Sequence, residues 1–152
     1  MGFGFRTAWE EMVKPMFQRP YRVQVAALCH RDAADGRQIL MITSRGTGRW
    51  ILPKGWPIDG LNGAESALLE AWEEAGVADA EIDPVAIGQY HYSKVLDFGG
   101  LAPVEAHVYS VRVKELASDY PEASQRTRRW VTPLEAAGMV KEPELQEILR
   151  AF

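Results

Sequence analysis

Cysteine is nearly absent from the sequence, since Cys29 is the only one among 152 residues. This excludes an intramolecular disulfide and a cysteine-based zinc site. Because Cys29 lies within an apolar run, we interpret it as a small core residue rather than as a catalytic thiol. Also missing are an apolar stretch of roughly 18 residues, which a membrane-spanning helix needs, and an uncharged signal-peptide core near the N-terminus. We therefore expect a soluble protein of the cytoplasm.

Excess positive charge is lacking as well. The formal net charge is −4, so the composition gives no general support for binding nucleic acid or an anionic membrane. Long runs of one charge sign are absent too, and the 25% charged and 47% apolar residues are ordinary for a globular protein with a core. An anionic ligand would have to be attracted by a local group of basic side chains.

The hydrophobic pattern divides the chain at about residue 20. Residues 1–20 carry apolar side chains at helical spacing, interrupted by Pro15 and closed by Pro20. This predicts a short N-terminal arm that packs on the domain or makes a dimer contact. Residues 21–152 alternate between strand-like and helix-like segments and are predicted to form one α/β domain. The expected strands cover residues 23–30, 38–43, 50–52, 85–92, 104–113 and 128–131, and helices are expected to begin near Gly63, after Thr132 and near Pro143.

The most informative segment is the predicted helix between Asn62 and Gly76. Asn62 with Glu65 resembles a capping box, and Gly76 suits the left-handed conformation at a helix C-terminus. At about 100° per residue, the apolar residues fall on one face that suits packing on a sheet, and three acidic residues fall on the opposite face. The apolar residues are Ala64, Leu68, Ala71, Trp72 and Ala75, and the acidic ones are Glu70, Glu73 and Glu74.

The acidic face lacks any compensating charge within the helix. No lysine or arginine occurs there, Glu70 and Glu74 form a like-charge i,i+4 pair, and all three acids lie near the negative end of the helix dipole. Each of these penalties amounts to roughly a few tenths of a kcal/mol. On charge pattern alone, a solvated acidic surface is the simpler interpretation. A hard divalent cation, which prefers oxygen ligands, would also compensate the charge.

The residues around this helix match a longer motif. Gly55 is preceded by Leu52-Pro53-Lys54 and is followed at fixed spacing by Glu70-Ala71-Trp72-Glu73-Glu74-Ala75-Gly76-Val77. This arrangement resembles the signature of the Nudix hydrolases, in which a glycine is followed by spaced acidic residues and a closing glycine–aliphatic pair. Such a long spaced match favours metal binding over a solvated surface.

Two positions depart from that signature. Leu61 stands where the family has a glutamate, and Leu69 where it has an arginine. In the family these two residues usually form a structural salt bridge, so here both charges are missing together. Replacing both members of a buried ion pair by apolar residues is often neutral. We therefore predict that Leu61 and Leu69 form a scaffold contact and leave the chemistry intact.

The resemblance covers the chain from about Arg22 to the C-terminus and implies a Nudix-type α/β/α sandwich with a mixed sheet. It also implies hydrolysis of a phosphoanhydride bond with Mg²⁺, or Mn²⁺, as cofactor. By analogy with the family, Glu70 and Glu74 would bind the metal and Glu73 would act as the general base. In the family the base varies between these glutamates and acids on later loops. Glu105 is either a further metal ligand or an ordinary strand residue.

Outside the signature, the chain looks most like the diphosphoinositol polyphosphate and dinucleoside polyphosphate hydrolases. Basic residues in the matching segments are candidate anchors for an anionic polyphosphate substrate. They are Arg22, Arg45, Lys54 and the run of residues 126–129, in which we select Arg128. Tyr90 and Tyr92 are candidates for stacking on a base or for core packing. No nucleic-acid or membrane partner is expected, and the chain is predicted to be a monomer or a homodimer.

Two alternatives stay open. The first is a catalytically silent Nudix-fold module that binds a nucleotide or a protein, which the missing signature arginine suggests. The second is a house-cleaning enzyme that acts on assorted nucleotide pyrophosphates. All three acids of the helix are present, and their presence favours an active hydrolase.

Overall fold

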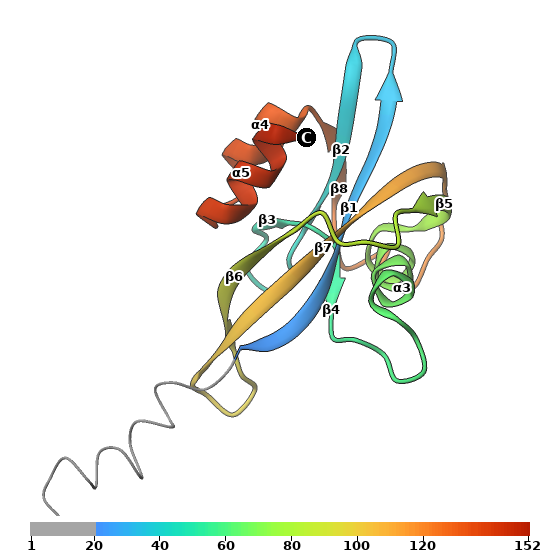
Figure 1. Cartoon of the computed structure of the whole chain (residues 1–152). Coiled ribbons are helices and arrows are strands. Elements are labelled where there is room, and N and C mark those ends of the chain that lie inside the picture. Colours follow the sequence, from blue (N-terminus) through green and yellow to red (C-terminus); the bar gives the residue numbers. More distant parts are fainter. Residues whose placement is uncertain (1–20) are drawn as a thin grey trace, which may run out of the picture.

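The computed structural model describes residues 21–152, so the N-terminal arm predicted over residues 1–20 lies outside the described residues. One mixed sheet separates two layers of helix (Figure 1). Its strands are β1 (Arg22–Ala33), β2 (Gly36–Thr43), β3 (Trp50–Ile51), β4 (Lys54–Gly55), β5 (Val77–Ile82), β6 (Gly88–Val95), β7 (Leu101–Leu116) and β8 (Arg128–Val131). The helices are α3 (Gly63–Ala75), α4 (Pro133–Met139) and α5 (Pro143–Ala151).

The two long strands β1 and β7 form the centre of the sheet. They run parallel, with Arg22 opposite Val104 and His30 opposite Arg112. The other edge of β7 pairs antiparallel with β6 along its first half and with β5 along its second half. The other edge of β1 pairs with β4 and then with β2, and β2 pairs in turn with β3 and β8. Each of the two long strands therefore pairs with two shorter strands along one of its edges.

Both faces of the central strand β1 are buried, as is usual for a strand covered by helices on two sides. Val25, Ala27 and Cys29 belong to the apolar cluster under α3. Ala26 and Leu28 belong to the cluster under α4 and α5. Figure 1 shows α3 on one side of the sheet and the α4–α5 pair on the other. The α/β/α sandwich with a mixed sheet is thus confirmed.

Local capping signals define the helix boundaries. Asn62 accepts a hydrogen bond from the Glu65 backbone N–H, and the Glu65 carboxylate accepts one from the Asn62 N–H, so the predicted capping box is confirmed. Gly76 ends α3 with φ 73°, in the left-handed region that glycine favours. Thr132 and Glu135 form the same reciprocal cap at the start of α4. These short-range patterns fix where the helices start and stop.

The sequence pattern missed two strands. β5 (Val77–Ile82) was not predicted, and it is held by pairing with the second half of β7. β4 (Lys54–Gly55) was not predicted either, and it pairs with Val25 and Ala26 of β1. None of the helices within residues 21–152 is both long and apolar enough to cross a membrane. The cytoplasmic location stays a prediction.

Candidate active site

A polar cavity of about 470 Å³ opens beside the end of α3 that carries the three acids. Its walls come from β1, the ends of β2 and β6, the β3–β4 segment, α3 and the turn before β8. The lining residues are Gln24, Ser44, Arg45, Ile51, Lys54, Gly55, Trp56, Glu70, Glu73, Glu74, Tyr92, Lys94, Glu122 and Arg126. Acidic and basic side chains from distant parts of the chain therefore face one space.

Glu74 does not lie on the solvent side of α3, which corrects the predicted helix orientation. Its exposed fraction is 4%, and it is buried on the same side as Ala67, Ala71 and Ala75. Trp72, which we expected against the sheet, lines an outer groove instead. The physical reason is that the small side chains of the alanines allow α3 to approach the sheet closely, and this orientation carries Glu74 inward.

The position of the Glu70 carboxylate depends on the absence of a side chain at Gly55. A Cβ atom at Gly55 would lie 2.4 Å from Cδ and Oε1 of Glu70, closer than any normal contact. Burial raises the pKa of Glu70 to about 7, and repulsion from Glu74 and Glu73 acts in the same direction. Glu70 is therefore a carboxylate that a nearby cation would stabilise strongly in its charged form.

Glu74 is held through both of its carboxylate oxygens. Oε2 accepts a hydrogen bond from the Lys54 backbone N–H at 3.2 Å, and Oε1 accepts one from Nη2 of Arg126 at 3.1 Å. The same Nη2 lies 3.1 Å from Oε1 of Glu122. Burial raises the pKa of Glu74, while Arg126 opposes that rise. The cation that the helix lacks thus comes from a residue 52 positions further along the chain.

The donor set fits a hard divalent ion, because four carboxylates and no soft ligand face the cavity. The space kept open at Gly55 leaves Glu70 free to face the cavity. Within residues 21–152, no three His, Cys, Asp or Glu side chains converge closely enough to enclose an ion by themselves. Magnesium typically takes one or two carboxylates and completes its shell with waters and substrate phosphates. An incomplete carboxylate set is therefore compatible with Glu70 and Glu74 as ligands.

Two of the four predicted anchor residues line the cavity. Arg45 is 60% exposed at its rim, where Nη1 lies 3.4 Å from Glu122 Oε1. Lys54 lies deeper, with Nζ 5.2 Å from the centre of the Tyr92 ring. Burial lowers the pKa of Lys54 to about 8, while Glu74 counteracts that effect. Both side chains can therefore offer positive charge to an anionic ligand near neutral pH.

The other two predicted anchors, Arg22 and Arg128, do not line the cavity. Arg22 is exposed at the start of β1, two residues before Gln24. Arg128 donates a hydrogen bond from Nη1 to the Ala75 carbonyl at 2.8 Å, and its guanidinium lies over the Tyr120 ring. From β8 its side chain points towards the end of α3. The structure thus engages Arg128 in capping a helix.

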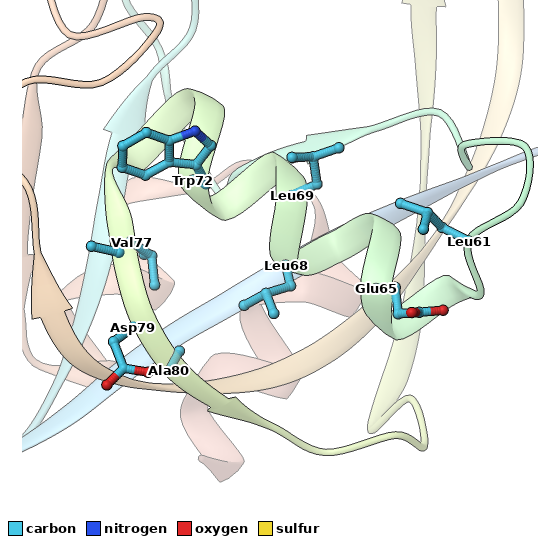
Figure 2. Close-up of a pocket in the computed structure, with 9 residues that line it drawn as sticks. Leu61, Glu65, Leu68, Leu69, Trp72, Val77, Asp79 and Ala80 are labelled. Carbon is cyan, nitrogen blue, oxygen red and sulfur yellow. The ribbon is translucent and has the colours of Figure 1, made fainter.

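Leu61 and Leu69, which we predicted to contact each other, do not line the polar cavity. Both residues line an apolar groove of about 650 Å³ between α3 and β5, together with Leu68 and Trp72 (Figure 2). Leu61 is 38% exposed, so this region is a surface groove rather than a buried pair. The groove contains no basic residue, which makes it unsuitable for a polyphosphate. Its leucines remain candidates for a scaffold contact.

Several lining residues had no signal in the sequence. Glu122 belongs to a turn, and its backbone N–H donates to the Glu73 carbonyl at 3.0 Å. Trp56 is 38% exposed at the cavity, next to Gly55. Gln24 is buried and accepts a hydrogen bond from the Tyr92 hydroxyl. Only spatial proximity identifies these three, since none forms part of a spaced motif.

Glu105 does not line this cavity. Its carboxylate lies between Nε2 of His91 at 3.1 Å and Nε2 of His107 at 2.8 Å, on the surface formed by β6 and β7. His91 also contacts Glu144 of α5 through Nδ1 at 2.9 Å. Glu105 therefore belongs to a surface network that ties a helix to the edge of the sheet.

Relatives of known family match most of the chain. A family model described as the NUDIX domain matches residues 20–152. Nudix hydrolase 12, mitochondrial, from Arabidopsis thaliana is 28% identical over 139 residues, which cover 88% of this chain and 68% of that protein. Nudix hydrolase 16, mitochondrial, from the same plant is 32% identical over 115 residues, which cover 74% and 63%. The chain spans about two thirds of the length of these relatives.

Solved structures with the same fold are more distant in sequence. An Ap4A hydrolase from C. elegans superposes with a TM-score of 0.62 at 17% identity, covering 86% of this chain and 95% of that one. The NUDIX domain of Shewanella oneidensis NrtR, solved with ADP ribose, also gives 0.62, at 16% identity and with coverage of 98% and 97%. At such identities the likeness shows the fold alone.

Proposed function

This chain belongs to the Nudix family, and from this membership we propose that it is a metal-dependent hydrolase that cleaves a phosphoanhydride bond in a polyphosphorylated small molecule. The observation that carries the proposal is the cavity in which Glu70, Glu73 and Glu74 face Arg45 and Lys54. Carboxylates suit a divalent ion and bases suit phosphates, so one space accommodates both parts of a metal–polyphosphate complex.

Each glutamate has a distinct proposed role. Glu70 and Glu74 would bind the metal. Glu70 would do so from the space that Gly55 leaves free, and Glu74 from its buried position at the wall of the cavity. Bound Mg²⁺ or Mn²⁺ neutralises phosphate oxygens and lowers the pKa of a coordinated water. Glu73 would accept the proton of the attacking water as general base. The hydrogen bond from the Glu122 N–H to the Glu73 carbonyl fixes this turn of α3 in place.

The proposed substrate carries a chain of several phosphates. Arg45 and Lys54 supply separate positive charges at the rim and in the interior of the cavity, and Arg22 stands just outside it. Several separated bases favour an extended anion over a single pyrophosphate. Diphosphoinositol polyphosphates and dinucleoside polyphosphates both meet this description. The fold neighbour named as an Ap4A hydrolase is compatible with the second class.

Trp56 favours the nucleotide class. An exposed indole beside a phosphate-binding cavity offers a flat apolar surface, and a nucleobase stacks on such a surface. An inositol ring carries no π-system and gains little from it. A dinucleoside polyphosphate is therefore the first substrate class to test.

The competing function is a catalytically silent Nudix module that binds a nucleotide. Its motivation is Leu69, which replaces the signature arginine. Against it stands the retention of all three acids in a cavity that also contains bases.

The purified protein should be incubated with diadenosine polyphosphates, a diphosphoinositol polyphosphate and ADP-ribose, with Mg²⁺ or Mn²⁺ and with or without chelator. We expect turnover of at least one long-chain substrate that chelation abolishes. Binding of a nucleotide without turnover of any compound would support the silent module. Comparable rates on all three compounds would support the house-cleaning enzyme.

The placement of the bases is tested separately. Arg45→Gln should raise KM more for a diadenosine polyphosphate than for ADP-ribose, because the longer chain reaches the rim of the cavity. Equal effects on both substrates would argue against Arg45 as a phosphate contact.

A further inference from the structure

Arg126 is an unusually enclosed cation. Its side chain is 6% exposed, and its Nη2 lies 3.1 Å from both Glu74 Oε1 and Glu122 Oε1. Nη1 donates to the Thr43 carbonyl at 3.0 Å. Nε is buried and has no hydrogen-bond partner. The guanidinium is therefore fixed between two carboxylates, with one of its donors unsatisfied.

The backbone keeps Arg126 in this position independently of the acids. Thr127 donates its N–H to Thr43 Oγ1 at 2.8 Å, and the Thr43 N–H donates to the Thr127 carbonyl at 3.0 Å. These bonds join the turn before β8 to the end of β2. The sheet therefore holds Arg126 beside the acidic cluster that lines the cavity, which consists of Glu70, Glu73, Glu74 and Glu122. The Lys54 N–H donates to the other oxygen of Glu74.

We propose that Arg126 is a built-in counter-cation of the acidic cluster and that it competes with the catalytic metal ion for Glu74. This inference rests on the proposed function, because it takes Glu74 as a metal ligand. A positive charge at hydrogen-bond distance from a ligand repels a divalent ion and occupies a lone pair that the ion would use. Arg126 therefore lowers the affinity of the free protein for metal.

The proposal has a consequence for the order in which metal and substrate bind. A site with weak affinity for the free ion takes up metal most readily when the ion arrives with substrate phosphates, which supply further oxygen ligands. If Glu74 turned to the metal, Arg126 would keep its bonds to Glu122 and to the Thr43 carbonyl and would have one donor free at the wall of the cavity. That donor would then be available to the phosphate chain, which pairs well with arginine.

A purely structural role for Arg126 predicts a different outcome. If Arg126 only holds Glu74 in place, removing it lets the carboxylate drift and weakens metal binding. If it acts as a competing charge, removing it strengthens metal binding even though it destabilises the metal-free fold. Loss of one partner of a buried ion pair leaves the other charge uncompensated, and a divalent ion can then take its place.

The test measures Mn²⁺ binding to the free protein by calorimetry and by electron paramagnetic resonance, without substrate. Arg126→Met should bind Mn²⁺ on the order of tenfold more tightly than the wild type and show a larger metal-induced rise in melting temperature. Arg126→Lys keeps the charge and should stay near the wild-type affinity. Arg45→Gln, which removes an exposed positive charge close to Glu122, is the matched control and should change the affinity much less.

Unchanged or weaker Mn²⁺ binding by Arg126→Met overturns the proposal, as does a failure of both proteins to bind Mn²⁺. If Arg126→Met does not fold without metal, its refolding is followed at increasing Mn²⁺. Rescue at concentrations below those that saturate the wild type supports a competing charge, and no rescue contradicts it. Because none of these readouts needs turnover, a protein that fails every substrate assay but shows the tighter binding would contradict only the proposed function.

Discussion

Gly55→Ala is the substitution whose effect follows most directly from the geometry. The new Cβ would stand 2.4 Å from Cδ and Oε1 of Glu70, and an ordinary contact begins at 3.4 Å. The Glu70 carboxylate must therefore retreat by about 1 Å. Misplacing a catalytic group by that amount costs roughly 10²-fold in rate. We expect kcat/KM with Mg²⁺ to fall by about that factor, together with weaker metal binding.

The fold should tolerate the same change. The clashing atoms belong to the end of a flexible side chain, and Gly55 does not have the positive φ that would strain an alanine. Alanine also restricts the unfolded chain, which stabilises a protein by about 0.4–1 kcal/mol where the conformation is compatible. The free energy of unfolding without metal should thus change by less than about 1 kcal/mol.

The assay compares steady-state turnover with denaturant unfolding of metal-free protein. Gly138→Ala in α4 is the matched control, because a Cβ there meets nothing within 4 Å. It should leave turnover unchanged. Full activity of Gly55→Ala would refute the argument that the glycine exists to seat Glu70. Loss of activity accompanied by loss of folding would refute the separation of site from scaffold.

Three further predictions concern other parts of the chain. Trp56→Ala should raise KM about tenfold for a diadenosine polyphosphate, the range expected for one stacked base, and leave a diphosphoinositol substrate unaffected; equal effects would remove the stacking role. The contact with Glu144 raises the pKa of His91 above its ordinary value of 6.5, so its stabilisation is complete below that value and is lost as pH rises through the folded pKa. The melting temperature should decline over that range, and Glu144→Gln should flatten the decline; an unchanged pH profile would contradict it. Leu69→Arg alone should destabilise the protein, because it replaces an apolar contact in the groove by a charge without a partner, and adding Leu61→Glu should restore part of the loss, whereas strictly additive effects in the double-mutant cycle would show that the two residues do not meet.

Short-range sequence signals carried much of the fold. The caps at Asn62 and Thr132 use reciprocal bonds between residues three apart, so both helix starts could be predicted from the local sequence alone. The same holds for Gly76, whose left-handed conformation ends α3. β5 was not predicted because alanine and acidic residues form strands poorly on their own. Its pairing with β7 supplies the stability that the local sequence lacks.

The site was predictable only in part, for a comparable reason. The spacing of Glu70, Glu73 and Glu74 identified the acids, but not that Glu74 turns towards the sheet. That orientation depends on which side of α3 packs closely, and on Arg126 reaching across from the segment before β8. Repulsion among the three acids would by itself leave the metal-free stability unchanged or raised when any one of them is replaced by glutamine. For Glu74 the structure points to a loss, because Arg126 would stay buried without its partner.

The most direct test of the central claim is Mg²⁺-dependent turnover of a diadenosine polyphosphate by the wild type and by Glu73→Gln. Glu81→Gln, at an exposed acid of β5 that pairs with Lys114, serves as the control. We predict that chelation abolishes wild-type turnover, that Glu73→Gln lowers kcat by about 10²-fold or more with an unchanged melting temperature, and that Glu81→Gln behaves as the wild type. Wild-type turnover that survives chelation, or a Glu73→Gln protein with normal turnover, would contradict hydrolysis by a metal site on α3.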